Sequence, residues 1–125
     1  MEPFKRLPDA ELEVMLLIWQ SHDAIHTGEL LQRLRKTKDC NLQMLQSTLN
    51  RLVSKQFIKC EKIGRLNFYT PLVDAEDYRI QEAGGMIEKL YENSPAKLFA
   101  ALFKNNALSE GEVMELKKLL EESGE

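Results

Sequence analysis

Residues 42–56 place polar and basic side chains at a spacing that suits contact with nucleic acid. If this segment is a helix, each residue turns by about 100°, so that Leu45, Leu49, Leu52 and Val53 share an inner face. The opposite face then carries uncharged polar side chains: Gln43, Gln46, Ser47, Asn50 and Ser54. Gln and Asn can bond adenine through two hydrogen bonds, and Ser can donate to or accept from several bases. We therefore predict that this helix contacts base edges.

The flank of the predicted helix adds a second kind of contact. Thr48, Arg51 and Lys55 lie together on it and suit phosphate groups beside the groove. Met44 lies near this flank, where it would contact a thymine methyl group or pack against the protein. The segment contains no Asp or Glu, whereas an ordinary solvated helix face is richer in Glu and Lys. A solvated face without a ligand is the alternative interpretation.

Two further segments carry groups that suit phosphates. Lys62 and Arg65 flank Gly64, which can adopt the positive φ of a tight hairpin turn. At a hairpin tip these cations would meet a neighbouring phosphate or the minor groove, although tip cations also occur on hairpins that bind no nucleic acid. Thr27 begins a short predicted helix whose first amide groups can donate to a phosphate. The DNA-binding residues are thus predicted to come from three elements.

Hydrophobic periodicity predicts the elements that position these residues. A period of 3.6 residues predicts three helices in the first half: 9–20 capped by Asp9, one from its cap Thr27 into the basic stretch 35–38, and 42–56 capped by Asn41. The period changes to two on both sides of Gly64, which predicts the hairpin. Three helices followed by a hairpin are typical of a winged helix-turn-helix.

The second half is predicted to form a helical dimerisation arm. Its helices are expected over 74–93, after Ser94 and after Ser109, with both serines as caps. Their apolar faces have little else to cover them, which predicts a homodimer. The expected dimer contacts are Met86, Ile87, Leu90, Tyr91, Leu98, Phe99, Leu102, Phe103, Val113, Leu116 and Leu120. The fold class is therefore mainly α with a small β-hairpin, with a DNA-binding domain over 1–72 and a dimerisation domain over 73–125.

The charge is distributed unevenly along the 125 residues. The whole chain has a formal net charge of −3. Residues 1–70 carry eleven basic and eight acidic side chains, whereas 71–125 carry six and twelve. Within 33–65 there are nine basic and two acidic side chains, a local charge of +7. Because attraction to phosphates is screened beyond about 8–10 Å, this local excess is the charge that matters for DNA.

Several other functions find no support in the sequence. It has no nucleophile motif, phosphate-cradling glycine loop or HExxH, and helix capping explains the paired acids Glu11/Glu13 and Glu110/Glu112. Two cysteines and two histidines are too few and too scattered for a structural zinc site. We expect no enzyme activity, no cofactor and no metal. The longest apolar run, 14–19, is far short of a membrane span, and no signal-type stretch follows the N-terminus, so we expect a cytoplasmic protein without membrane insertion.

The sequence resembles the penicillinase and methicillin-resistance repressors, with the copper-transport repressors as relatives. The resemblance is carried, in order, by LPDAELEVM at 7–15 with IW at 18–19, TLNRL at 48–52 with Lys55 and FI at 57–58, FY at 68–69, and LS at 108–109 running to LKKLL at 116–120. It implies a winged-helix homodimer that represses transcription on a palindromic operator and dimerises through its C-terminal helices. It also implies release by proteolysis in the last region, commanded by a membrane sensor.

This sequence departs from the family pattern at several positions. The family's recognition helix usually opens with Ser, then has Lys or Arg and then Thr, where this chain has Gln43, Met44 and Gln46. Gln56 stands where the family has a glycine, and Ala101 and Leu102 align with its scissile Asn–Phe pair. We therefore expect a different operator sequence, and no copper sensing because the paired Cys-x-Cys elements are absent. A winged-helix protein-interaction module that binds no DNA is the alternative function.

Overall fold

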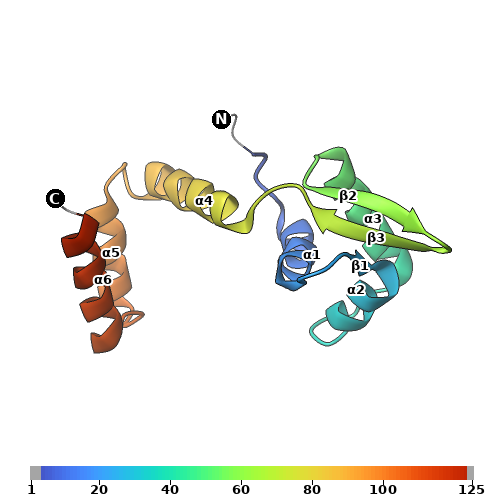
Figure 1. Ribbon diagram of the computed structural model, residues 1–125. Coiled ribbons are helices and arrows are strands. Elements are labelled where there is room, and N and C mark those ends of the chain that lie inside the picture. The colour runs from blue at the N-terminus through green and yellow to red at the C-terminus, as the bar shows by residue number, and fades with distance from the viewer. Residues whose placement is uncertain (1–3, 124–125) are drawn as a thin grey trace. The chain divides into compact units, whose positions relative to one another are not determined.

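The computed structural model describes residues 4–123, and the chain divides into two compact units. The first unit ends at Glu82 and the second begins at Ala83. The first contains α1 (Asp9–Gln20), β1 (Ile25–His26), α2 (Thr27–Leu34), α3 (Leu42–Ser54), β2 (Ile58–Ile63), β3 (Leu66–Pro71) and the start of α4 (Ala75–Leu90). The second contains the rest of α4, α5 (Pro95–Lys104) and α6 (Glu110–Ser123). Figure 1 follows this order from blue to red and confirms the predicted winged helix with a helical arm.

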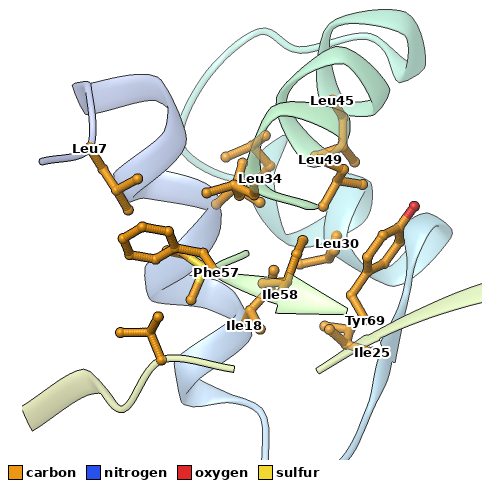
Figure 2. Close-up of a cluster of buried hydrophobic side chains, with 14 of the residues drawn as sticks. Leu7, Ile18, Ile25, Leu30, Leu34, Leu45, Leu49, Phe57, Ile58 and Tyr69 are labelled. Atoms are coloured by element: carbon orange, nitrogen blue, oxygen red, sulfur yellow. The ribbon is translucent and has the colours of Figure 1, made fainter. Parts of the chain in front are cut away.

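One hydrophobic core holds the helices of the first unit against the hairpin, as Figure 2 shows. Its buried members are Leu7, Val14, Met15, Ile18, Ile25, Leu30, Leu34, Leu45, Leu49, Leu52, Phe57, Ile58, Tyr69, Val73 and Tyr78. Three of the four side chains predicted on the inner face of residues 42–56 are among them. The fourth, Val53, is 38% exposed, so that prediction is wrong. Val53 lies farthest round the helix from the centre of this face, where the core no longer covers it.

Both ends of α3 are fixed by hydrogen bonds. At its start the side chain of Asn41 accepts from the backbone N–H of Met44 at 2.8 Å, which confirms the predicted cap. At its end the N–H of Phe57 donates to the carbonyl of Leu52, and the N–H of Gln56 donates to that of Val53. This bond pair is a Schellman motif, which requires a left-handed residue, and Gln56 accordingly has φ 64°. The motif ends the helix two residues earlier than predicted.

The sheet has three antiparallel strands in the order β1–β3–β2. In the predicted hairpin Ile63 pairs with Leu66, and Gly64 in the turn has φ 64°. Ile25 of β1 pairs with Tyr69 of β3. Strand β1 was not predicted, because a strand of two residues is too short to show a period of two.

The helix caps were predicted with mixed success. Ser94 accepts from the N–H of Lys97, and Ser109 and Glu112 bond reciprocally as a capping box, which confirms both serine caps. Asp9 and Thr27 are instead the first residues of their helices, without a capping bond from their side chains, and Pro8 and His26 occupy the cap positions. Pro8 and His26 have the extended backbone that is typical of a cap residue, so each helix can begin directly after them.

Within the first unit, polar contacts join the start of α4 to the N-terminal segment. The backbone N–H of Leu7 donates to the Tyr78 hydroxyl at 2.9 Å, and that hydroxyl donates to Glu82 at 3.3 Å. Burial raises the pKa of the Tyr78 hydroxyl above its ordinary value of 10.0, and the negative charge of Glu82 raises it further. The compact unit therefore ends at Glu82, ten residues beyond the predicted domain boundary at position 72. The division into a DNA-binding and a dimerisation domain at that boundary stays a prediction.

Candidate nucleic-acid interface

The outer face of α3 is exposed because its inner face is bound into the core. Leu45, Leu49 and Leu52 are buried, which turns the opposite side of the helix to solvent. The predicted base-contacting residues on this side are exposed: Gln43, Met44, Ser47 and Asn50. A hollow of about 430 Å³ collects several of them with their neighbours: Ala10, Asn41, Gln43, Met44, Ser47, Thr48 and Arg51. The structure thus brings the polar side chains together on a rigid helix.

Gln46 is half-buried rather than fully exposed, because it links α3 to the sheet. Its Nε2 group donates to Oδ1 of Asn50 at 3.0 Å and to the hydroxyl of Tyr69 at 3.4 Å. These bonds leave Oε1 of Gln46 and Nδ2 of Asn50 for other partners. Side chains held in this way lose less rotamer freedom when they bind a ligand.

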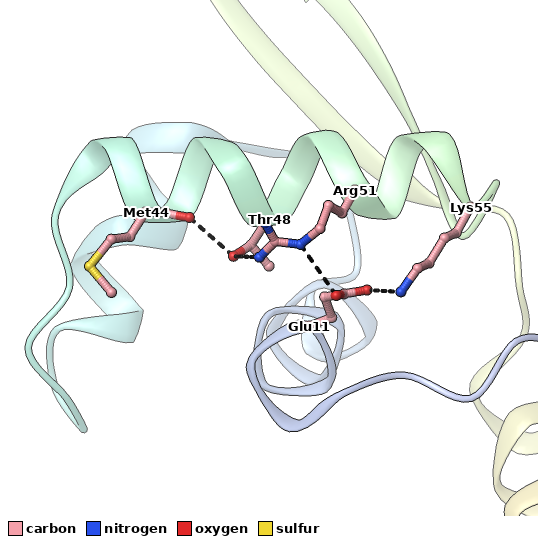
Figure 3. A network of polar contacts seen from close by, with 5 residues as sticks. All are labelled: Glu11, Met44, Thr48, Arg51 and Lys55. Atoms are coloured by element: carbon pink, nitrogen blue, oxygen red, sulfur yellow. Dashed lines mark hydrogen bonds and ion pairs between the residues drawn. The ribbon is translucent and has the colours of Figure 1, made fainter.

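A polar network joins the flank of α3 to α1, as Figure 3 shows. Nε of Arg51 lies 3.3 Å from Oε2 of Glu11, and Nζ of Lys55 contacts Oε1 of the same carboxylate. Nη2 of Arg51 donates to Oγ1 of Thr48 at 3.2 Å, and that hydroxyl donates to the carbonyl of Met44 at 3.1 Å. The orientation of both cations is therefore set within the protein.

The network changes what the flank residues can do. Thr48 is buried with its hydroxyl already bonded, so the prediction that it suits a phosphate is wrong. The side chain of Lys55 is only 22% exposed, whereas that of Arg51 is 52% exposed. Arg51 is therefore the more accessible of the two predicted phosphate contacts.

Glu11 is the residue that the sequence analysis missed. Its side chain is 5% exposed, and it provides the one carboxylate shared by both cations of the network. The prediction that helix capping explains Glu11 was incomplete. The signal was its position, because Glu11 precedes the buried Val14, Met15 and Ile18 at the i+3, i+4 and i+7 spacing of an inner face.

The remaining predicted contacts lie on two other elements. Lys62 and Arg65 are exposed at the tip of the hairpin, beside the exposed apolar pair Ile63 and Leu66. Thr27 is half-buried at the first position of α2. These residues lie in the first unit together with α3.

The predicted dimer residues lie on α4, α5 and α6. The most exposed of them are Met86 at 40%, Leu90 at 71%, Phe103 at 56% and Leu120 at 65%. Met114 and Leu119 are further exposed apolar side chains that were not predicted. Phe99 is at the margin of exposure, and the others are half-buried: Ile87, Tyr91, Leu98, Leu102, Val113 and Leu116. Ala101 and Leu102 are half-buried within α5.

Residues 4–123 contain neither a candidate metal site nor a candidate membrane span. No group of three or more His, Cys, Asp or Glu side chains is placed to hold a metal ion in this part of the chain. No helix there is long and apolar enough to cross a bilayer.

Three helices, a hairpin wing and an exposed third helix define a winged-helix protein of the DNA-binding class. The chain belongs to the penicillinase repressor family, whose sequence profile matches residues 7–122. The chain is 34% identical to the penicillinase repressor of Bacillus licheniformis over 122 residues, which covers 98% of this chain and 94% of that protein. It is 26% identical to the methicillin resistance regulatory protein MecI of Staphylococcus aureus (strain N315) over 114 residues, covering 91% and 92%.

Solved structures show the same relationship over part of the chain. The solution structure of the DNA binding domain of the repressor BlaI has a TM-score of 0.54 and 40% identity, covering 62% of this chain and 94% of that one. The monomeric form of Bacillus licheniformis BlaI, solved in complex with the blaP half-operator, has a TM-score of 0.53 at the same identity and coverage. The chain is therefore a DNA-binding transcriptional repressor and not an enzyme.

Proposed function

We propose that the chain represses transcription as a homodimer on a palindromic operator, with α3 of each copy in the major groove. The observation that carries this proposal is the outer face of α3, which is exposed, polar and free of acidic residues over 42–56. Acidic side chains would repel the phosphates beside the groove, whereas amides and hydroxyls match base edges. The half-operator bound by the related BlaI supports placing DNA at this unit.

The residues of the interface divide into two roles in this proposal. Base edges are contacted by Gln43, Gln46, Ser47 and Asn50, with Met44 against a thymine methyl group. Phosphates are contacted by Thr27, Arg51, Lys55, Lys62 and Arg65. Lys55 contributes mainly through its charge, because most of its side chain is covered and paired with Glu11. Contacts to phosphates fix the position of α3 but carry no sequence information.

The exposed apolar side chains of the second unit support the homodimer. Met86, Leu90, Phe103 and Leu120 are between 40% and 71% exposed, which is unfavourable for a monomer in water. A two-fold dimer would place two copies of α3 on half-sites about 34–36 Å apart or a multiple of that spacing. Light scattering should give a mass of about twice 14.4 kDa, and a 14.4 kDa particle at micromolar concentration would contradict the dimer.

The regulation implied by the family resemblance is also a proposal. A membrane sensor would command cleavage near Ala101 and Leu102, which lie inside α5. A protease binds its substrate in an extended form, so α5 would have to unwind locally before cleavage. Within one copy α5 has no buried residues, so the main cost of such unwinding is the loss of its apolar contacts in the proposed dimer. A repressor acts on DNA inside the cell, which supports the predicted cytoplasmic location.

A binding titration tests the proposed function. Arg51→Ala should weaken binding to every duplex and reduce the salt dependence, whereas Gln46→Ala should change the base preferred at one position. Arg79→Ala and Gln20→Ala are matched controls, because both residues are exposed and lie outside α3. No measurable binding of the unaltered chain to duplex DNA at low salt would instead favour the protein-interaction module.

A further inference from the structure

A basic pocket lies beside α3 and is lined in part by the DNA-contacting residues assigned above. It has a volume of about 360 Å³ and is lined by Lys5, Asn50, Arg51, Ser54 and Lys55. Four of these residues come from α3 or its end, whereas Lys5 comes from the segment before α1. Lys5 was not among the predicted DNA contacts, because nothing in the sequence places it near residues 50–55.

The charges around this pocket suit one phosphodiester group. Lys5, Arg51 and Lys55 are cations, and Glu11 is the carboxylate paired with the last two. Three positive charges against one negative charge leave +2, which exceeds the single charge of a phosphodiester. A phosphodiester only accepts hydrogen bonds, and Lys, Arg, Asn and Ser side chains can all donate.

The backbone on both sides of Lys5 is anchored by hydrogen bonds to α4. The backbone N–H of Phe4 donates to Oε1 of Gln81 at 2.7 Å, and Nε2 of Gln81 donates to the carbonyl of Phe4 at 2.8 Å. Leu7 is bonded to Tyr78, as described above. None of the ion pairs within residues 4–123 involves Lys5, so its charge is available to a ligand. The backbone at Lys5 is thus anchored to α4, and a ligand there would not need to order a loose arm.

We propose that this pocket binds one phosphate of the DNA backbone, and that Lys5 is a DNA-binding residue together with Arg51 and Lys55. Glu11 is the positioning residue, because it holds Arg51 and Lys55 at the rim while Lys5 faces them from the N-terminal segment. This inference rests on the proposed function, since it assigns one backbone contact within that interface. The pocket would fix the register of α3 in the groove, because Asn50 and Arg51 lie on the same helix turn as the base-contacting face.

The test compares Lys5→Gln with Lys104→Gln, which removes the same charge from an exposed position at the end of α5. The probes are a random 30-base-pair duplex and an operator obtained by selection, each titrated over a range of salt concentrations. Losing one phosphate contact in each copy of the proposed dimer should reduce the slope of log K against log salt by about 1.8 and weaken binding up to about sixty-fold at 0.1 M. Both duplexes should lose the same factor, Lys104→Gln should match the unaltered chain, and Lys5→Arg should restore the slope.

The outcomes separate this inference from the proposed function. If the unaltered chain fails to bind duplex DNA at 50 mM salt, the proposed function is wrong. If the unaltered chain binds and Lys5→Gln keeps its full slope, the phosphate pocket is overturned while the function stands. A Lys5→Gln loss confined to the operator would also overturn it, because a backbone contact acts equally on all sequences.

Discussion

Replacement of the buried carboxylate by an amide of the same shape, Glu11→Gln, should lower the free energy of unfolding markedly. Removing one partner of a buried ion pair costs about 3–5 kcal/mol when the remaining charge stays buried. Here Arg51 is 52% and Lys55 22% exposed, so both can regain some water. We therefore expect a loss of about 2 kcal/mol. With a urea m-value of about 1–2 kcal/mol per M for a small unit, the midpoint should fall by about 1–2 M.

The matched control is Glu13→Gln on the same helix. Glu13 pairs with Lys38 at 3.1 Å, but these side chains are 46% and 37% exposed. A surface pair of this kind contributes about 0–1 kcal/mol, so this variant should unfold close to the unaltered chain. Trp19, the single tryptophan, reports unfolding by fluorescence because it bonds Val73 and packs on Tyr78. Equal losses for the two variants at one protein concentration would refute the argument that burial makes the Glu11 network strong.

Three further variants test how local structure is built. Gln56→Gly should raise the free energy of unfolding by about 0.5–1 kcal/mol, because Gln56 holds the left-handed position of the Schellman motif. Gly64→Ala should lower the free energy of unfolding by about 1 kcal/mol, because Gly64 has φ 64°, although open space surrounds it. Urea titration measures the stability of both variants. Changes of the opposite sign would contradict the strain assigned to these two positions. Tyr78→Phe should remove the part of the alkaline loss of stability that comes from ionisation of the Tyr78 hydroxyl. The raised pKa means that the folded state keeps the hydroxyl proton longer than the unfolded state, so this contribution is complete below about pH 10 and disappears as pH rises through the folded pKa. The stability difference between Tyr78→Phe and the unaltered chain should therefore shrink above pH 10, and a constant difference would contradict this.

Much of the first unit could be predicted from the sequence, because its signals are local. The boundaries of α1 and the start of α3 follow from apolar spacing and from the Asn41 cap, and Gly64 identifies the hairpin turn. The family resemblance rested on short stretches in the right order, and the comparisons confirm it. These features depend on residues within a few positions of one another.

The parts that escaped prediction depend on contacts between distant residues. The contacts of Glu11 with Arg51 and Lys55 join positions 40 and 44 residues apart. Strand β1 exists because Ile25 pairs with Tyr69, and Lys5 reaches its pocket because Phe4 is bonded to Gln81. No periodicity within a segment contains this information. An acidic residue at an inner-face position, as at Glu11, is the one sequence signal that indicates such a distant partner.

The central claim is that the outer face of α3 meets the bases, and nuclear magnetic resonance of the chain with a selected operator tests it most directly. On titration with the duplex, the side-chain amide signals of Gln43 and Asn50 should shift strongly, while that of Gln20 on α1 stays in place. Strong shifts confined to α5 and α6, with the amides of α3 unmoved in the bound state, would contradict the account.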